Sequence, residues 1–375
     1  MWKLSPRPAS ISWFRSWGTE MGTLLDDLRG MKRMDPDGML THCLELPDQI
    51  RAGWQWGLDW RLPARWRNLD GICLLGMGGS AIGADLANGF AGGKLARPLR
   101  VNRDYRLPGG LHRRTGILIS SYSGNTEETL SAAEAALRRG LPAAAITSGG
   151  KLAALARRRR LPLVLIPSGL PPRGAVGYGT FVLMGLLRRL KWIPAIPVPS
   201  AAAGLERTIA RSLAPAVPLR RNPAKQLARR LAGRIPILYG GADGWEGVTF
   251  RWRTQLEENA KTVCFHHIFP EATHNEISGW VHPAPGIRRT AAVFLTDPSV
   301  HPRTLKRMRF AARIIRREGA GCLEVGMKGP DRFDRMLRMI ALGDFLSVYL
   351  AFLYRENPTP VVRVEALKKY LRSGR

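Results

Sequence analysis

The sequence predicts an α/β protein of two lobes, each built around a doubly wound parallel β-sheet with flanking helices. Short apolar runs alternate with amphipathic helical segments, and this alternation is typical of parallel sheets. A Pro-rich passage at residues 193–200 interrupts the alternation, which then begins again. The chain has 375 residues, more than one hydrophobic core usually serves. The two halves of the chain have a similar order of strands and helices, which is consistent with an internal duplication.

The first 67 residues divide into an extension and a helical region. Residues 1–20 carry four aromatic side chains, little periodicity and no long apolar stretch of the kind that a signal peptide needs. We therefore assign them to an N-terminal extension of unknown order. Residues 21–67 predict N-terminal helices, because Leu24, Leu25 and Leu28 recur at helical spacing.

Residues 68–192 predict the first α/β domain. An apolar run ends in a turn and is followed by a helical segment, and this order repeats along the domain. The predicted strands are residues 71–75, 99–102, 116–120, 143–147 and 163–166. The predicted helices are residues 81–90, 127–139 and 152–159.

Residues 193–214 predict a Pro-rich linker, and residues 215–375 predict the second domain with a C-terminal helix. The predicted strands of this domain are residues 235–239, 291–295 and 322–325. Its predicted helices before the C-terminal one are residues 245–259, 304–317 and 333–354.

Basic residues outnumber acidic ones by 58 to 29, which gives a formal net charge of +29. Such a balance is found in nucleic-acid-binding proteins. Only 11 of the 58 are lysine, however, and the arginines are spread along the whole chain, with several of them in pairs. A nucleic-acid surface would more often cluster its charge with aromatic residues or on a reading helix. We therefore favour a compositional bias toward arginine, whose positive field also helps to gather anionic substrates.

The cysteines and the apolar runs indicate the redox environment of the protein and whether it enters a membrane. Cys43, Cys73, Cys264 and Cys322 are far apart in the chain and form no CxxC pair, so the sequence predicts neither a zinc site nor a disulfide framework. This usage fits a reducing, cytoplasmic setting. No apolar run approaches the ~20 residues that span a bilayer, so we expect no membrane insertion.

Two turns between a strand and a helix are candidates for anion binding, because backbone N–H groups and the helix dipole converge at such a turn. The first is GMGGS at residues 76–80, whose glycines let the backbone approach a ligand and whose Ser80 adds a hydroxyl. Its spacing is not the dinucleotide fingerprint GxGxxG. About half of such turns serve only helix packing, so this turn alone is weak evidence.

The second turn, SSYSGNT at residues 120–126, is more specific, because it places four Ser or Thr hydroxyls directly after a strand. Hydroxyls and amides can each donate to a phosphate oxygen, and a hydrogen bond to a charged group contributes on the order of 1.5 to 3 kcal/mol. The alternative is an N-cap role for Thr126. Capping explains one hydroxyl and not four, so we favour phosphate binding.

GMGGS followed by SYSGNTEET resembles the sugar isomerase (SIS) domain. The remaining motifs resemble the bifunctional phosphoglucose/phosphomannose isomerases of that superfamily, and only the N-terminal extension is left uncovered. The resemblance implies two SIS-type lobes with a sugar phosphate bound between them. It implies that Ser121, Ser123 and Thr126 hold the phosphate, and that Gly79 and Ser80 contact the sugar.

Isomerising an aldose phosphate needs a group that opens the ring, a base near C2 and a cation over the enediolate. The segment TQLEENAK resembles the family's helix that carries the catalytic glutamate just before an asparagine and a lysine. The resemblance gives the role of base to Glu258. Glu257 places a second carboxylate beside it, and spacing alone does not decide which of the two faces the cleft.

The segment PEATHNEI resembles the family motif with the ring-opening histidine, which implies this role for His274. An imidazole exchanges a proton near neutral pH, as ring opening requires. The nearby His266 and His267 have no carboxylate at the spacing of a metal site, so we interpret them as packing or surface residues. The segment GLPPRG resembles the one whose arginine lies over the enediolate, which implies this role for Arg173.

The segment ALKK near the C-terminus resembles the one that supplies a lysine to ring opening. The resemblance favours Lys368 for this role, and Lys369 is left open. It also implies a homodimer in which His274 crosses the interface, and neither a metal nor a nucleotide cofactor.

Together these motifs predict an aldose–ketose isomerase of glycolysis and gluconeogenesis. It would interconvert glucose 6-phosphate and mannose 6-phosphate with fructose 6-phosphate, by ring opening and a cis-enediolate. The first alternative is a SIS regulator that binds a sugar phosphate without catalysis, which the charge of +29 motivates. No helix-turn-helix candidate precedes residue 70 or follows residue 330 to support it. A second alternative is a SIS enzyme with another substrate, such as an amino-sugar isomerase.

Overall fold

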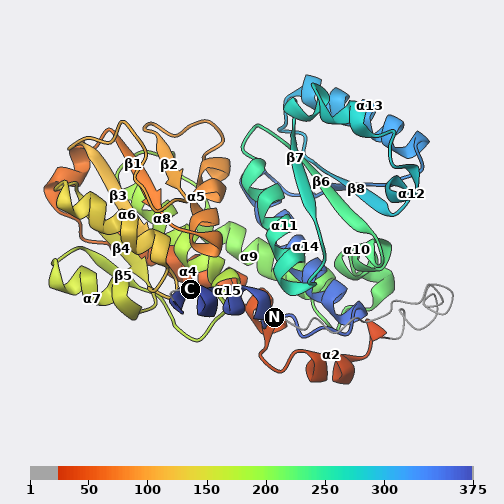
Figure 1. The fold of residues 1–375 in the computed structure, drawn as a ribbon, viewed down its shortest axis with the longest axis horizontal. Helices are drawn as coiled ribbons and strands as arrows, with labels where there is room; N and C mark the ends of the chain where they lie inside the picture. Colours follow the sequence, from red (N-terminus) through yellow and green to blue (C-terminus); the bar gives the residue numbers. More distant parts are fainter. Residues whose placement is uncertain (1–23, 374–375) are drawn as a thin grey trace.

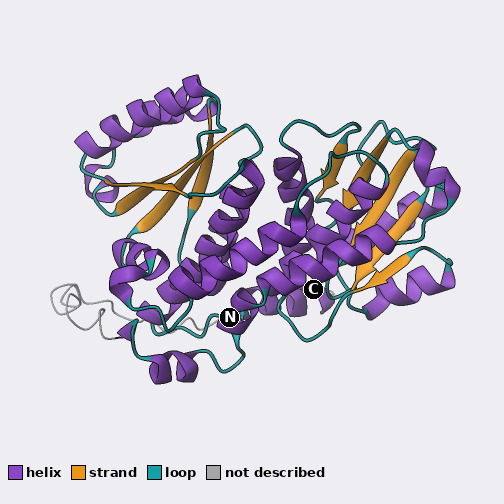
Figure 2. Ribbon diagram, turned by 180° about the vertical axis from the view of Figure 1, so that it is seen from behind, coloured by secondary structure: helices purple, strands orange, loops and turns teal. Residues whose placement is uncertain are grey.

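The computed structural model describes residues 24–373, and its strands form two separate parallel sheets, one in each of two lobes (Figure 1). The extension predicted for residues 1–20 lies outside the described residues. Helices surround both sheets, and several of them run between the two lobes (Figure 2). The predicted fold class is therefore confirmed.

The first lobe holds a five-stranded sheet in the order β2-β1-β3-β4-β5, with every pair parallel. Its strands are β1 (Gly71–Leu75), β2 (Leu99–Asn102), β3 (Thr115–Ser120), β4 (Ala143–Thr147) and β5 (Leu163–Leu165). Its helices include α5 (Gly78–Ala91), α6 (Glu127–Arg138), α7 (Gly150–Arg158) and α8 (Val176–Arg189). The sequence predicts all five strands to within one residue, but it does not predict α8.

Alternate side chains of β1 face opposite sides of this sheet, as the pleat requires. Ile72 and Leu74 belong to the large core shared with α5 and α8. Cys73 and Leu75 belong to a separate core formed with the alanine-rich faces of α6 and α7. Every residue of β1, β3 and β4 is buried, which explains why these strands are apolar apart from the terminal residues Thr115, Ser120 and Thr147.

The second lobe holds a four-stranded parallel sheet in the order β7-β6-β8-β9. Its strands are β6 (Ile235–Gly241), β7 (Phe265–Phe269), β8 (Thr290–Thr296) and β9 (Gly321–Gly326). Its helices include α10 (Pro223–Leu231), α11 (Glu246–Asn259), α12 (Ala284–Ile287) and α13 (Pro302–Arg317). Because β7-β6-β8-β9 repeats the order β2-β1-β3-β4, the topology supports the internal duplication. The sequence analysis does not predict β7.

The remaining helices join the lobes. They are α2 (Leu28–Met34), α3 (Met39–Leu44), α4 (Leu46–Asp59), α9 (Val198–Thr208), α14 (Arg332–Leu353) and α15 (Val362–Arg372). Residues 193–214, predicted as a linker, contain α9, whose Val198, Ala202 and Leu205 are fully buried. Proline at the first turn of α9 is compatible with a helix start, so the Pro-rich composition does not exclude a core helix here.

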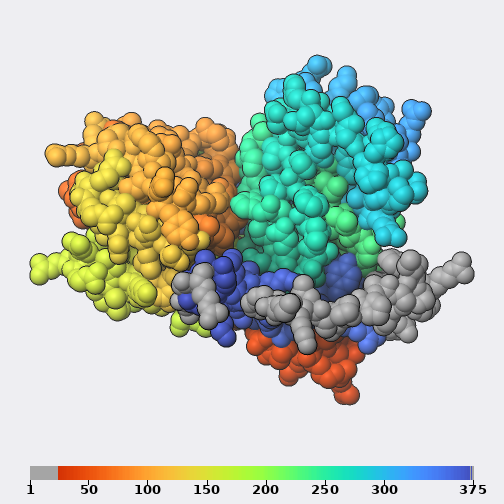
Figure 3. All heavy atoms as spheres, viewed as in Figure 1, coloured from red at the N-terminus to blue at the C-terminus, as the bar shows by residue number. Residues whose placement is uncertain are grey.

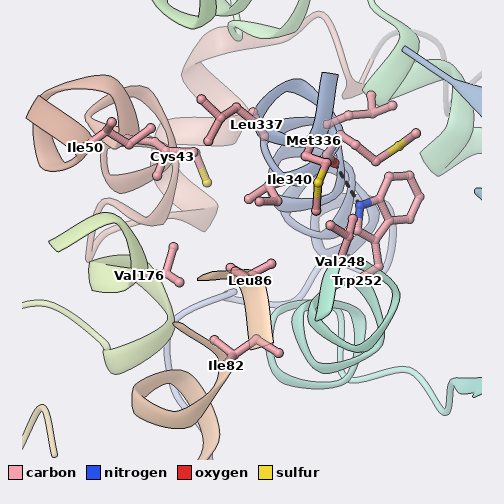
Figure 4. Packing of buried hydrophobic residues seen from close by; sticks show 14 of the residues in the cluster. Cys43, Ile50, Ile82, Leu86, Val176, Val248, Trp252, Met336, Leu337 and Ile340 are labelled. Carbon is pink, nitrogen blue, oxygen red and sulfur yellow. Dashed lines mark hydrogen bonds between the residues drawn. The ribbon is translucent and has the colours of Figure 1, made fainter. Parts of the chain in front are cut away.

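The largest hydrophobic core lies where helices of both lobes meet. Figure 4 shows Ile82 and Leu86 of α5 facing side chains of α11 and α14. Trp252 of α11 is buried there and donates from Nε1 to the carbonyl oxygen of Met339 at 2.9 Å. α14 is long and apolar enough to cross a membrane, but 94% of its most apolar window is buried inside the protein. It is therefore the central helix of this core.

Candidate active site

The two predicted ligand loops lie side by side at the carboxyl edge of the first sheet. One follows β1 and the other follows β3, and these strands are neighbours. Because β2 lies on the other side of β1, the strand order reverses here, and such a switch point is where open α/β sheets bind ligands. A hydrogen bond links the loops, since the backbone N–H of Tyr122 donates to Ser80 Oγ at 2.9 Å.

The predicted phosphate hydroxyls gather within the second loop. The hydroxyls of Ser121 and Thr126 are hydrogen-bonded to each other at 2.9 Å, and Ser121 is buried. Ser123 is exposed, and its Oγ accepts from the backbone N–H of Asn125 at 3.2 Å. Gly124 adopts φ +65°, and a Cβ there would lie 1.9 Å from the Gly149 carbonyl oxygen. The loop therefore requires glycine at this position.

The alternative N-cap role of Thr126 is not what the structure shows. Thr126 is the N-cap residue of α6, but its side chain makes no capping hydrogen bond. Met77 at the N-cap of α5 makes none either. The first turns of two helices therefore meet at this edge without a side-chain cap, which leaves backbone N–H donors free for an anion.

Gly79 joins the first loop to the segment that carries Arg173. A Cβ on Gly79 would lie 3.0 Å from the Pro172 carbonyl oxygen and 3.3 Å from the Arg173 nitrogen. Arg173 itself lies in the short 3-10 helix Pro172–Ala175. A side chain at Gly79 would force its neighbours to shift, so the glycine favours this close packing between the first turn of α5 and the segment that carries Arg173.

Arg173 is buried and uses all three guanidinium nitrogens. Its Nε donates to Asn259 Oδ1 at 2.5 Å, and its Nη1 donates to Glu258 Oε2 at 3.2 Å. Its Nη2 donates to the carbonyl oxygens of Pro358 and Thr359 at 2.7 and 2.8 Å. Burial lowers the pKa of Arg173, while the Glu258 carboxylate opposes this shift. The arginine is thus a fixed cation that bridges the two lobes and the C-terminal segment.

The structure distinguishes the two neighbouring glutamates. Glu258 points to Arg173, and its side chain is 35% exposed. Glu257 points elsewhere and pairs with Arg253 at 3.6 Å. Successive helical residues are rotated by about 100°, so only one of them can face the arginine. Of the two, Glu258 is the carboxylate beside the fixed cation.

Lys261 is a site residue to which the sequence analysis gives no role. Its Nζ donates to the carbonyl oxygens of Glu258 at 2.6 Å and Pro358 at 3.0 Å. Burial, with a contribution from the nearby Arg173, lowers the pKa of Lys261 to about 8. The motif contains Lys261 shortly after Asn259. The second partner of Lys261 is a backbone carbonyl oxygen almost one hundred residues away, and nothing in the sequence indicates this contact.

We expect Lys261 to make the stability of the protein depend on pH above pH 8. Its pKa is about 8 in the folded protein against 10.5 for an ordinary lysine, so the unfolded chain holds the proton more tightly. Burial of the charged ammonium group therefore lowers the free energy of unfolding by its full amount below pH 8. This destabilisation disappears as the pH rises toward 10.5. Urea unfolding of the wild type and Lys261→Met at about pH 7, 8, 9 and 10 measures this. The free energy of unfolding of the wild type should rise relative to the variant across this range, and a constant difference would contradict the assignment.

The remaining polar groups of α11 form a buried network with α14. Arg251 donates to Asp344 Oδ2 at 2.7 Å and to the Arg173 carbonyl oxygen at 3.1 Å. Gln255 donates to the other oxygen of Asp344 at 2.9 Å. Asn259 donates to Ser347 Oγ at 2.9 Å. This network fixes the face of α11 that presents Glu258, and the sequence analysis does not predict it.

His274 lies away from these residues. It is exposed and follows β7 at the end of the 3-10 helix Glu271–Thr273. Glu258 comes before β7, which has five residues and is roughly 15 Å long. The two side chains therefore lie toward opposite ends of this strand. Among the described residues, the His274 side chain has no hydrogen-bond partner.

His266 and His267 have partners of their own. His266 stacks on Phe250 with ring centroids 5.4 Å apart, and burial, Arg253 and His267 lower its pKa to about 4. His267 Nδ1 lies 3.1 Å from Glu276 Oε2. Within residues 24–373, no group of three or more His, Cys, Asp or Glu side chains is placed to hold a metal ion.

Lys368 and Lys369 both lie on α15 and are exposed. In the described part of the chain, neither side chain makes a hydrogen bond or an ion pair, so the structure does not choose between them. α15 follows directly after Pro358 and Thr359, whose carbonyl oxygens hold Arg173. The start of this helix is therefore anchored at the site.

Comparison with known proteins gives consistent matches. Residues 220–371 match the model of the bacterial phospho-glucose isomerase C-terminal SIS domain. A bifunctional phosphoglucose/phosphomannose isomerase of Caldicellulosiruptor bescii is 36% identical over 334 residues, covering 89% of this chain and 98% of the relative. One of Thermoplasma acidophilum is 32% identical, covering 88% and 98%.

Solved structures share the fold. A hypothetical protein from Thermus thermophilus superposes with a TM-score of 0.73 at 15% identity, covering 96% of this chain and 97% of the other. A glucose-6-phosphate isomerase like protein from the same organism superposes with a TM-score of 0.60 at 19% identity, covering 89% and 97%. At these identities the likeness concerns the fold alone.

Proposed function

The chain belongs to the bifunctional phosphoglucose/phosphomannose isomerase family, and we propose that it interconverts glucose 6-phosphate and mannose 6-phosphate with fructose 6-phosphate. The observation that carries this proposal is the position of Arg173, which contacts Glu258 at 3.2 Å and packs against the Gly79 turn. A base, a fixed cation and a ligand loop thus lie in one continuous set of contacts.

The phosphate binds at the loop after β3. Ser121, Ser123 and Thr126 donate their hydroxyls to its oxygens, and the uncapped first turn of α6 adds backbone N–H groups. Gly79 and Ser80 contact the sugar from the first turn of α5. No lysine or arginine is required in this loop, because neutral donors satisfy the phosphate oxygens.

The proton transfer takes place at the other end of the sugar. In the open-chain aldose, Glu258 removes the proton from C2 and returns it to C1, while a proton moves from O2 to O1. The cis-enediolate that forms in between carries negative charge on its oxygens. Arg173 stabilises this charge, and its four hydrogen bonds fix the guanidinium before the substrate arrives.

Ring opening needs a residue from a second copy of the chain. His274 and Glu258 lie toward opposite ends of β7, so we infer that the two residues of one chain act on different sugar molecules. We therefore assign His274 to the partner's active site in a homodimer, with Lys368 as the second group for ring opening. α15 supports a dimer, since its Val362, Leu367 and Tyr370 are 68%, 54% and 54% exposed.

Mixing two inactive variants tests this shared site. Glu258→Gln and His274→Ala should each be inactive as homodimers. In a heterodimer, one of the two sites keeps both wild-type residues, so a randomised equimolar mixture should recover roughly a quarter of wild-type turnover. Turnover that stays at the level of the separate variants, with exchange of subunits shown by mass spectrometry, would contradict a shared site.

The phosphate loop should govern substrate binding more than turnover. Loss of one hydrogen bond to a charged group costs on the order of 1.5 to 3 kcal/mol, so Ser121→Ala or Thr126→Ala should raise KM for glucose 6-phosphate about 10- to 100-fold. Steady-state kinetics measures this effect. Ser131→Ala on the exposed face of α6 is the matched control, and an equal effect in this control would contradict the assignment.

A coupled assay with glucose 6-phosphate and mannose 6-phosphate tests the proposed function itself. Formation of fructose 6-phosphate from both is the expected result. Tight binding of these sugar phosphates without turnover would instead favour a regulator. Such an isomerase would serve glycolysis and gluconeogenesis, and its four free cysteines fit the cytoplasm.

A further inference from the structure

A second cavity lies between the lobes, away from Glu258 and Arg173. Its volume is about 850 Å³, which is within the range of small-molecule sites. It is lined by the second half of α5, the loops after β6 and β8, and Arg332 at the start of α14. Figure 3 shows that the two lobes are separated by a hollow along one side of the molecule. None of the residues assigned to the isomerase site lines this cavity.

The cavity occupies the switch point of the second sheet. β6 and β8 are neighbours, and β7 lies on the other side of β6. The strand order therefore reverses at β6, as it does at β1 in the first lobe. Residues 242–245 after β6 correspond to the GMGGS turn, and residues 297–301 after β8 correspond to the serine loop. By its place in the fold, this cavity is the second-lobe counterpart of the sugar-phosphate site.

Each of the two sites also contains one end of a helix that belongs to the other lobe. α5 and α11 have 14 residues each and run in opposite directions, because Gly247 at the start of α11 packs on Asp85 and Gly89 near the end of α5 packs on Gly244. α11 begins at the second cavity and carries Glu258 of the isomerase site in its last turn. α5 begins at the isomerase site and brings Asp85 and Asn88 to the second cavity. Each site thus combines its own lobe's loops with a helix of the other lobe.

The polar lining differs between the two sites. Three carboxylates, those of Asp85, Asp243 and Glu246, line the second cavity. Burial raises the pKa of Asp85 and of Glu246, so neither carboxylate is well solvated. No counterpart of the cluster of hydroxyls is present in this lining. A phosphate would meet carboxylates here in place of hydroxyl donors, so the cavity does not suit the ligand of the first lobe.

Cations offset most of this negative charge. Arg103 forms an ion pair with Asp85. Arg332 donates from Nη1 to Ser299 Oγ at 3.0 Å and from Nη2 to the Asp243 carbonyl oxygen. The two arginines therefore offset two of the three carboxylate charges, which leaves the site with a small negative charge.

We propose that this cavity binds a neutral polyhydroxylated molecule, namely an unphosphorylated hexose or hexitol. The carboxylates of Asp85, Asp243 and Glu246 accept from adjacent hydroxyl groups. Asn88 adds an amide, whose nitrogen already donates to the Leu99 carbonyl oxygen at 3.2 Å and whose oxygen is left to accept. Leu95 and Val300 supply an apolar wall for the C–H face of the ring.

Calorimetric titration of the full-length protein with glucose, mannose, fructose and sorbitol tests this proposal. Glu246→Gln keeps the shape of the wall but removes a strong acceptor, and it should weaken binding at least tenfold. Leu95→Trp fills the cavity and should abolish binding. The double variant Ser121→Ala/Thr126→Ala should bind these molecules as the wild type does, because its changes lie in the other site. Glu318→Gln, at an exposed position after α13, is the matched control.

Two outcomes would overturn the proposal. One is no heat and no change in ligand NMR signals with any of the four compounds. The other is binding that Ser121→Ala/Thr126→Ala removes and that Glu246→Gln and Leu95→Trp leave intact, which would place the sugar in the isomerase site. Turnover of glucose 6-phosphate is measured on the same samples. Because neither Glu246 nor Leu95 belongs to the isomerase site, the failure of one proposal does not decide the other.

Discussion

Glu258→Gln should lower kcat for glucose 6-phosphate about 10²- to 10⁴-fold, the usual contribution of a general acid–base group. Glutamine keeps the size of the side chain. It also keeps an oxygen that can accept the hydrogen bond that Arg173 Nη1 donates to Glu258 Oε2 at 3.2 Å. It cannot accept and return a proton. The variant should therefore fold as the wild type does and should still bind fructose 6-phosphate, so that only turnover is lost.

Glu257→Gln is the matched control for this substitution. Glu257 occupies the adjacent position, but it pairs with Arg253 and faces away from Arg173. Its substitution should change kcat less than about threefold, because no proton transfer depends on it. If Glu257→Gln abolished turnover and Glu258→Gln did not, the base would be the other carboxylate.

Arg173→Lys should lower kcat about 100- to 1000-fold, which is the effect of removing a preorganised donor from a developing oxyanion. Arg173 bonds to Asn259, Glu258, Pro358 and Thr359 through three nitrogens in a fixed planar arrangement. A lysine has its donors on one nitrogen and cannot reach all of these acceptors. At least one buried carbonyl oxygen would lose its partner, so the free energy of unfolding should also fall by a few kcal/mol.

Arg253→Lys is the control for Arg173→Lys. Arg253 lies on the same helix as Glu258. Its guanidinium pairs with the carboxylate of Glu257 at a partly exposed position and lies over the Phe250 ring, 4.7 Å from the ring centroid. It should change stability by less than about 1 kcal/mol and leave kcat within a few-fold of the wild type. Kinetics and urea unfolding are measured on both variants. Full turnover in Arg173→Lys would contradict the role of this arginine over the enediolate.

The strands of the first lobe could be predicted closely because each is a short apolar run with a turn on either side. β7 could not, since its sequence FHHIF has two histidines in the middle and neither alternates nor forms an apolar run. α9 is hidden in the sequence because Pro197 and Pro199 suggest a linker, although proline is well tolerated at a helix start. Composition indicates a break at a position where tertiary packing stabilises a helix.

The candidate site, like the fold, could be predicted only in part from the sequence. The hydroxyl cluster of residues 120–126 and the position of Glu258 could be located from motifs. The choice between Glu258 and Glu257 required the structure, because it depends on which face of α11 packs on α14. The other partners of Arg173, and those of Lys261, could not be predicted. Two of them are the backbone carbonyl oxygens of Pro358 and Thr359, and every residue has such a group.

The central claim is that Glu258 moves a proton between C2 and C1. The most direct test is the exchange of carbon-bound hydrogen of the substrate with deuterium from the solvent. Fructose 6-phosphate is incubated with the wild type in D₂O and followed by ¹H NMR. The proposed mechanism predicts deuterium at C1 of the ketose and at C2 of the glucose and mannose 6-phosphates that form. Glu257→Gln should retain this exchange, and Glu258→Gln should lose it. Exchange that persists at the wild-type rate in Glu258→Gln would contradict it.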